Sequence, residues 1–200
     1  MANNDFVIDD YIQEELTFNP VRELLFGLFL FLTTGLAFGI PFFLRWGSYF
    51  HGFFDYAEFS FIIRFMAING ILGIVIFILG IITHEILHGI FYALFLKNGL
   101  KSIKIGIVLK KGFAYCESKE VMRTNQFIIG LMMPTIILGI IPSIISIFNG
   151  SMGLFLFGLV FTMAGAGDIL ILTRIIKDRN ETWFENLPSI GKWSVYRPIE

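Results

Sequence analysis

The sequence predicts an all-α polytopic membrane protein with about four transmembrane helices and a small cytoplasmic β-hairpin between the second and third helices. Hydrophobic residues make up 56 % of the 200 residues and charged residues only 16 %, whereas a soluble domain carries about a quarter charged residues. Apolar residues also occur in runs as long as the ~20 residues that one helical crossing of a bilayer needs. Between the second and third runs, apolar and polar residues alternate with the period of a β-strand.

Composition also excludes several classes of protein. The formal net charge of −1 excludes a broad basic surface for nucleic acid. A single cysteine, Cys116, excludes an intramolecular disulfide framework and a cysteine-rich zinc site. The acidic N-terminus lacks the basic region of a cleaved signal peptide, so we expect the first hydrophobic segment to be retained. The length is that of one domain, and we expect a single membrane-embedded unit over residues 1–200.

Four apolar segments are each long enough to cross a bilayer. The predicted transmembrane helices span residues 24–44, 66–96, 125–148 and 152–176. Asn19-Pro20 marks the start of the first helix, because Asn is a favoured cap and Pro a favoured first helical residue. We expect Pro41 to kink or end this helix. An aromatic-rich connector at the membrane surface is expected to follow over residues 45–58.

The second apolar segment begins ahead of its predicted crossing. It extends from residue 59 to residue 96, which is more than one crossing needs. Either one long tilted helix fills it, or Asn69-Gly70 joins an interfacial helix to the crossing itself. We favour a spanning helix over residues 66–96, because Lys97-Asn98-Gly99 then supplies the cation and glycine that commonly end a helix.

The long polar loop at residues 97–124 is predicted to contain a β-hairpin over residues 103–116. Isoleucines alternate there with polar residues and glycine, and a turn at Lys110-Lys111-Gly112 separates the two strands. This loop and the C-terminal tail, residues 180–200, together hold nine of the 15 Lys and Arg, whereas the connector at residues 45–58 holds one. The positive-inside rule therefore places both in the cytoplasm. Four crossings place the acidic N-terminal tail, residues 1–18, on the same side.

One short motif in the second apolar segment carries the chemistry. His84-Glu85-Ile86-Leu87-His88 has the H-E-x-x-H pattern. On a helix, His84 and His88 share one face, so both imidazoles can bind one Zn²⁺. Glu85 lies about 100° around the helix, where it can act as general base on water activated by the metal. Ionisable residues are costly in a bilayer, which favours a functional motif over a chance match.

A catalytic zinc site needs a third protein ligand, and Asp168 is the best candidate. It is the only acidic residue deep in the last predicted helix. An ion pair with Arg174 is the alternative, but six residues along a helix rotate the two side chains apart by about 240°. His51 lies in the first connector, which we expect on the side of the membrane away from the motif. We therefore predict a surface histidine there.

Two features are candidates for binding substrate. Asn125 and Gln126, at the start of the third helix, either bind the substrate backbone or cap the helix. The hairpin at residues 103–116 either receives an extended substrate as an added strand or is a plain connector. The expected partners are a membrane protein or peptide substrate and the lipid bilayer, with no nucleic acid.

These motifs resemble the zincin peptidase family of small bacterial membrane proteins, which is similar to the site-2 proteases. The resemblance covers about residues 60 to 180. It rests on the motif at residues 84–89, the segment Phe113–Cys116, Pro134 and Gly167-Asp168. It implies that His84, His88 and Asp168 bind zinc. It also implies that Glu85 is the base. One departure is that Asp168 follows Gly-Ala-Gly, whereas site-2 proteases commonly have Asn-Pro-Asp-Gly.

The sequence thus predicts an intramembrane zinc-dependent endopeptidase of the bacterial cytoplasmic membrane. It would hydrolyse peptide bonds in or near the membrane with a metal-activated water. The alternative is a membrane protein that binds metal without proteolysis, either a transporter or a scaffold for a partner helix. A transporter should show further polar residues along a pathway, and the other helices offer few. A scaffold would not need Glu85.

Overall fold

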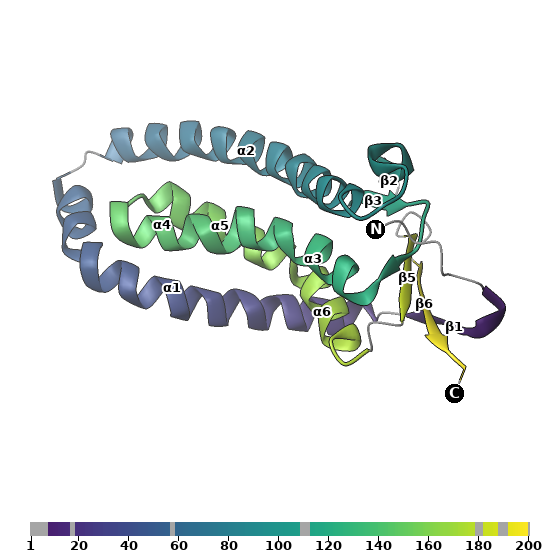
Figure 1. Cartoon of the computed structure of the whole chain (residues 1–200). Helices are drawn as coiled ribbons and strands as arrows, with labels where there is room; N and C mark the ends of the chain where they lie inside the picture. The colour runs from purple at the N-terminus through teal and green to yellow at the C-terminus, as the bar shows by residue number, and fades with distance from the viewer. Residues whose placement is uncertain are drawn as a thin grey trace.

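The chain folds into an elongated helical bundle with a small β-sheet at one end (Figure 1). This computed structural model describes residues 8–16, 19–56, 59–108, 113–178, 182–187 and 192–199. The longer helices are α1 (Pro20–Tyr56), α2 (Phe59–Ala93), α3 (Thr124–Pro134), α4 (Ile141–Asn149), α5 (Met152–Ala164) and α6 (Ala166–Ile175). A π-helical segment, η3 (Thr135–Ile140), joins α3 to α4, and two short 3₁₀ turns are η1 (Ile8–Asp10) and η2 (Gly99–Ser102).

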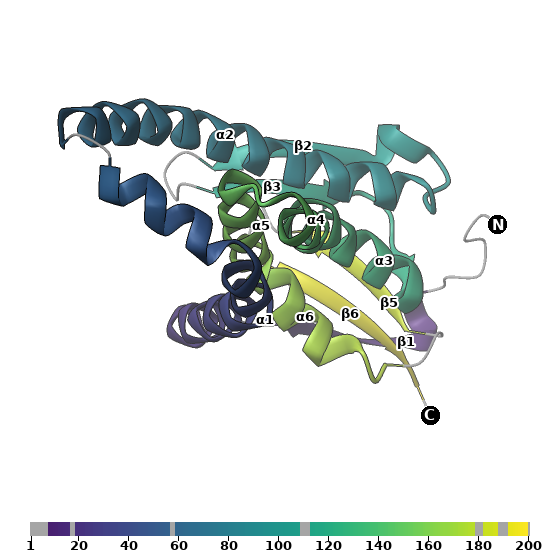
Figure 2. The ribbon, with the colours of Figure 1, turned by 90° about the vertical axis from the view of Figure 1, so that its left-hand side faces the viewer.

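The helices cross the bundle four times in alternating directions. α1 leads away from the sheet and α2 returns to it, then α3–η3–α4 leads away and α5–α6 returns (Figure 1). Figure 2 views the same bundle after a quarter turn, with α4 and α5 between α2 and α1. Both ends of the described chain and the loop after α2 therefore lie at one end of the bundle.

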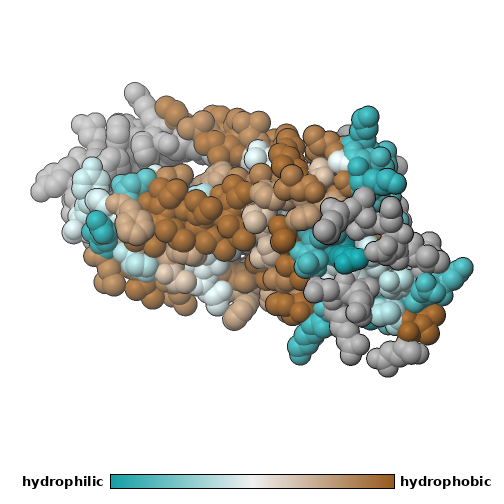
Figure 3. Space-filling view, in the orientation of Figure 1, coloured by the Kyte–Doolittle hydropathy of each residue, from teal (hydrophilic) through white to brown (hydrophobic). Residues whose placement is uncertain are grey.

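The surface of the bundle is suited to a bilayer. Three helices are long and apolar enough to cross one, Leu24–Tyr49, Gly70–Ala93 and Thr124–Asn149, and a fourth crossing results if α5 and α6 count as one bent span. Many large apolar side chains on these spans point outward, as Leu44 does with 84 % of its surface exposed. In Figure 3 hydrophobic residues cover the middle of the bundle, and polar residues gather toward its ends. The predicted number of about four crossings agrees with these three to four spans.

The first helix is longer than predicted. The residues expected to form a surface connector, 45–58, are helical as far as Tyr56, and residues 57–58 lie outside the described part of the chain. Pro41 is accommodated inside α1, because Phe38 before it and Trp46 after it both pack against the buried cluster that contains Phe155 of α5. At 37 residues, α1 is about 55 Å long and exceeds the ~30 Å hydrocarbon core of a bilayer.

Two contacts just after Pro41 explain this continuation. The buried ring of Phe42 stacks on Phe155 of α5, with ring centroids 4.9 Å apart. The indole Nε1–H of Trp46, one turn further on, donates to the carbonyl oxygen of Ile147 in α4 at 3.0 Å. Packing against the neighbouring helices thus overrides the local tendency of proline to end a helix.

The second and last crossings also differ from the prediction. α2 runs from Phe59 to Ala93 rather than over the predicted residues 66–96. It is continuous through Asn69-Gly70, which excludes a join there and agrees with the alternative of one long helix. The last crossing, predicted as one helix, bends by 46° between α5 and α6. The bend falls at Gly165, which is pressed against Thr135 so closely that a Cβ atom would overlap its side chain. Glycine tolerates both the close approach and the break in the helix.

The predicted hairpin is present. β2 (Ile103–Val108) pairs antiparallel with β3 (Phe113–Ser118), in a register that joins Ile103 to Ser118 and Val108 to Phe113. The predicted turn at Lys110-Lys111-Gly112 lies outside the described residues.

A second sheet was not predicted, because residues 1–18 and 180–200 were expected to be tails. It has the strand order β1-β6-β5-β4. Its strands are β1 (Tyr11–Leu16), β4 (Met122–Arg123), β5 (Trp183–Leu187) and β6 (Lys192–Pro198). Arg197 of β6 pairs with Glu14 of β1 and, at 3.2 Å, with Asp178 beyond α6. The chain is therefore helical with two small antiparallel sheets rather than all-α.

The main hydrophobic core joins this terminal sheet to the helices. Its buried members come from α2, the turn that follows it, α3, α6 and four strands. They are Tyr92, Leu96, Cys116, Met122, Phe127, Leu131, Ile171, Ile175, Phe184 and Val195. This core lies next to the residues of the H-E-x-x-H motif.

Candidate metal centre

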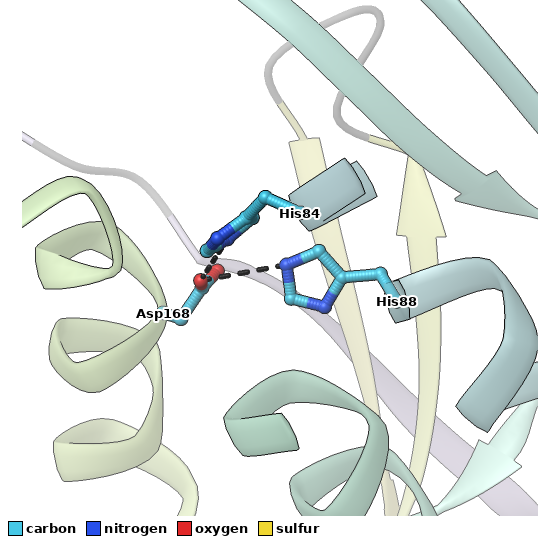
Figure 4. Close-up of side chains that lie close together, drawn as sticks. All are labelled: His84, His88 and Asp168. Carbon is cyan, nitrogen blue, oxygen red and sulfur yellow. Dashed lines mark hydrogen bonds and ion pairs between the residues drawn. The ribbon is translucent and has the colours of Figure 1, made fainter. Parts of the chain in front are cut away.

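The structure brings His84, His88 and Asp168 together at the end of the bundle nearer the sheet. Both histidines project from the last turns of α2, and Asp168 projects from the first turn of α6 (Figure 4). Nε2 of His84 is 3.1 Å from Oδ2 of Asp168, and Nε2 of His88 is 3.4 Å from the same oxygen. Possible ligand atoms of the three residues all lie within 4.8 Å of one another. In the described part of the chain, this is the one group of three metal-ligating side chains that lies so close together.

The local sequence explains this convergence. The four-residue spacing of the histidines places both on one face of α2. The bend at Gly165 starts a new helix, so that Asp168 falls in the first turn of α6, where the positive end of the helix dipole favours a carboxylate. Asp168 pairs with the two histidines and not with Arg174, the alternative partner considered from the sequence. Arg174 lies at the other end of α6, in its last turn.

The donor set fits a cation such as Zn²⁺. Nδ1 of His88 is 3.0 Å from the carbonyl oxygen of Gly130, and because a carbonyl only accepts, this nitrogen carries the proton. The lone pair of a neutral His88 is then at Nε2, facing a carboxylate oxygen. Two such acceptors are held together favourably only by a proton or a metal ion between them. Two imidazoles and one carboxylate, with a fourth position left over, are the ligand set of catalytic zinc sites.

The two histidines differ in the hydrogen bonding of Nδ1, the ring nitrogen that does not face Asp168. His84 and His88 are both buried, with 7 % and 6 % of their surface exposed. Nδ1 of His88 is satisfied by Gly130, whereas Nδ1 of His84 has no hydrogen-bond partner among the described residues. Buried polar atoms without a partner are uncommon, and this one belongs to the same group of side chains.

Glu85 lies beside the three residues, next to His84 on α2. It is half-buried, and its carboxylate interacts electrostatically with His84, His88 and Asp168. A carboxylate next to the ligand group, but outside it, can exchange protons with water there. The motif predicts this role for Glu85, and it stays a prediction.

His88 lies at one end of a stack of aromatic rings. The His88 ring lies parallel to that of Tyr92, with centroids 5.7 Å apart and an interplanar angle of 11°. Tyr92 stacks on Phe127 at 5.6 Å, and Phe127 stacks on Phe184 of β5 at 5.1 Å. The stack connects a candidate metal ligand to the terminal sheet.

Two residues in the surroundings of His88 were not predicted from the sequence, Gly130 and Tyr92. Tyr92 could have been found from its four-residue spacing to His88, which places the two on the same helical face. Gly130 could have been suspected from Pro134, which lies four residues later and cannot donate a hydrogen bond to it.

The two predicted substrate-binding residues make capping contacts in the structure. The side-chain oxygen of Gln126 accepts the backbone N–H of Arg123 at 3.1 Å. The side-chain oxygen of Asn125 accepts the N–H of Gln126 at 2.9 Å. The capping alternative is thus present, and a role in binding substrate stays a prediction. His51 lies in the last turns of α1, far along the chain from the motif, and its side chain is outside the described part.

A helical chain with apolar spans, in which the two histidines of an H-E-x-x-H motif face an aspartate, has the features of a metallopeptidase. Residues 77–183, more than half of the chain, match the model of the family described as "Putative zincin peptidase". The chain belongs to this family, and the match includes all three candidate ligands. No curated protein and no solved structure matches the chain.

Proposed function

We propose that the protein is an intramembrane zinc endopeptidase, which hydrolyses peptide bonds in or near the bilayer. The observation that carries the proposal is the convergence of His84, His88 and Asp168 within segments apolar enough to cross a membrane. Family membership supports a zinc-dependent peptidase. The position of the ligand group within apolar spans supports action inside the membrane.

His84, His88 and Asp168 would hold the zinc ion. When bound, zinc supplies a Lewis acid that polarises a carbonyl group and makes water a nucleophile near neutral pH. The backbone carbonyl of Gly130 holds the His88 ring so that its Nε2 faces Oδ2 of Asp168, and His88 would bind the ion through this nitrogen.

Glu85 performs the proton transfers. Its carboxylate accepts a proton from the attacking water as the water oxygen forms a bond to the carbonyl carbon of the scissile peptide. The C–N bond then breaks, and Glu85 delivers the proton to the leaving amine nitrogen. The water is consumed, one acid and one amine are formed, and Glu85 returns to its starting state.

A membrane substrate must unwind before cleavage, because a helix hides its peptide bonds. The β2–β3 hairpin packs against α2 directly after His88: a Cβ atom built on Gly89 would lie 3.0 Å from Ile103 and 3.5 Å from Cys116. A two-stranded sheet at this place suits the addition of an extended peptide as a further strand. We propose that the hairpin binds substrate in this way.

Water would reach the ligand group from the end of the bundle that carries the sheets. Both ligand-bearing segments lie close to this end, because α2 ends there at Ala93, soon after His88, and α6 ends there at Ile175, soon after Asp168. The positive-inside rule predicts that this end is cytoplasmic. We therefore propose cleavage near the cytoplasmic face, with both chain ends in the cytoplasm.

A comparison of membrane proteomes tests the proposal even though the substrate is unidentified. Cells that carry wild-type protein should contain cleavage fragments that disappear with Glu85→Gln. Glu15→Gln, on the exposed face of β1, is the matched control and should leave the fragments unchanged. Identical fragments in all three strains would contradict proteolysis and favour a metal transporter or a scaffold.

A further inference from the structure

We propose that Pro134 is a positioning residue for His88, acting through the backbone carbonyl of Gly130. The missing N–H of proline leaves this carbonyl without its partner in the helix, and the imidazole of His88 takes the vacant place. The inference rests on the proposed zinc site and names a device that prepares one of its ligands.

The geometry of α3 shows why the carbonyl needs a partner. In an α-helix the oxygen of residue 130 accepts the N–H of residue 134. Pro134 has helical dihedral angles, φ −60° and ψ −45°, so the backbone is placed for this bond, but proline has no N–H to donate. A carbonyl freed in an apolar environment needs another donor, because no water is there to pair with it.

The donor that it meets is on the neighbouring helix. Nδ1 of His88 lies 3.0 Å from the Gly130 oxygen, and both atoms are buried. The bond determines the tautomer, since an acceptor-only carbonyl requires the proton on Nδ1. It leaves the lone pair on Nε2, 3.4 Å from Oδ2 of Asp168, which is the direction in which a metal would be bound. An outer hydrogen bond of this kind orients a histidine ligand.

Gly130 allows α2 and α3 to come close enough for this bond. A Cβ atom at residue 130 would overlap the ring of Tyr92. That ring in turn stacks on His88 with an interplanar angle of 11°. Glycine at this position thus lets Tyr92 and the Gly130 carbonyl hold the imidazole from two sides.

Pro142 supplies a matched control within the same crossing. It lies in the first turn of α4, after the π-helical segment, where a proline is compatible with the helix start. No hydrogen bond from a candidate metal ligand to the backbone of α4 is present among the described residues. Replacing either proline by alanine restores one backbone N–H in the crossing, but only Pro134→Ala supplies a competitor for the Gly130 carbonyl.

The test measures zinc affinity by competition with a chromophoric chelator and, separately, the unfolding temperature of the metal-free protein. We expect Pro134→Ala to weaken zinc binding about 10- to 100-fold, the range typical of lost outer-shell partners. The metal-free variant should unfold close to the wild-type temperature, because the Gly130 carbonyl exchanges the His88 N–H for the backbone N–H of residue 134. Pro142→Ala should bind zinc within twofold of wild type. Equal zinc affinity in Pro134→Ala and Pro142→Ala would overturn the inference.

A second measurement needs no proline variant. The ¹⁵N chemical shifts of metal-free wild-type protein distinguish the two histidine tautomers, and the signal of His88 is assigned by its loss in His88→Gln. We expect Nδ1 of His88 to carry a proton, whether or not Nε2 also carries one, and an unprotonated Nδ1 would overturn the inference. A wild-type protein that binds no zinc would instead contradict the proposed function, so the two failures are distinguishable.

Discussion

Oδ2 of Asp168 lies 3.1 Å from Nε2 of His84, although 84 residues separate the two in sequence. The contact joins the last crossing of the bundle to the second. It places the carboxylate against two imidazoles in the interior of the bundle. If these three side chains bind zinc, the carboxylate charge should matter more than its shape.

Asp168→Asn tests this charge. We expect zinc affinity to fall by at least tenfold, because an amide oxygen is a neutral and weaker ligand than a carboxylate. Asp178→Asn is the control, since Asp178 pairs with Arg197 at the terminal sheet and should leave zinc affinity unchanged. Equilibrium competition titrations check both variants, and an Asp168→Asn protein that retains wild-type affinity would exclude Asp168 as a ligand.

The Phe127–Phe184 contact connects the terminal sheet to the stack that ends at His88. Phe184 is 1 % exposed, so Phe184→Ala should lower the free energy of unfolding by about 3–5 kcal/mol, as large-to-small core substitutions do. Ile199→Ala, at a side chain that is 58 % exposed, should change it by less than about 0.5 kcal/mol. Denaturant unfolding in detergent measures both. Equal stability of the two variants would show that the sheet does not contribute to the core.

Glu120 caps the turn that follows α2. Its carboxylate accepts the N–H groups of Lys97 at 2.9 Å and Asn98 at 3.3 Å, and also the hydroxyl of Ser102. Partial burial acts to raise the pKa of Glu120, but the hydrogen bonds from Ser102, Asn98 and Lys97 outweigh it and lower the pKa below the usual 4.5. A lowered pKa in the folded state means that the ionised form is stabilising.

This stabilisation is present above pH 4.5 and is lost as the pH falls through the folded-state pKa of Glu120. We expect Glu120→Gln to reduce the stability at pH 7 by about 1 kcal/mol, a modest value because the site is largely exposed to solvent. The variant should also lose part of the acid sensitivity of wild type. Hydrogen exchange of the amides of residues 97–102 between pH 3 and pH 7 measures the effect, and identical protection in both proteins would contradict it.

Cys116 is expected to be unreactive in the folded protein. It is 3 % exposed, and burial, together with the charges of Glu85 and Glu117, raises its thiol pKa to about 12. Since the thiolate is the reactive form, maleimide labelling at pH 8 should be slow in the folded state and fast after denaturation. Rapid labelling of the folded protein would show that the hairpin opens away from α2.

The elements that the sequence predicted well are those with local signals. The histidines of the motif share a helix, so their common face follows from spacing alone. Asp168 stood out because acidic residues are rare in apolar helices. The hairpin was visible in the alternation of Ile103, Ile105 and Ile107 with other residues, and its two strands are in the structure.

The elements that were missed depend on contacts between distant segments. The acidic residues of β1 made this segment look like a polar tail in the sequence. In the structure β1 pairs with β6, Tyr11 with Pro198 and Leu16 with Trp193, so the pairing joins segments from the two ends of the chain. The continuation of α1 past Pro41 depends on Phe155 and Ile147, far away in sequence. Neither relationship leaves a local pattern, because non-local pairing is decided by packing rather than by propensity.

The central claim is that Glu85 performs the proton transfers at a zinc ion held by His84, His88 and Asp168, and one experiment on a matched pair of proteins tests it. Wild-type protein and Glu85→Gln are each reconstituted into lipid vesicles with a membrane protein whose fragments disappear in the Glu85→Gln cells of the proteome comparison. Bound zinc and cleavage of that membrane protein are measured on the same samples. We predict one zinc ion per chain in both proteins and cleavage by wild type alone, with loss of at least 100-fold in the variant. Cleavage by Glu85→Gln at the wild-type rate, with zinc bound, would contradict the claim.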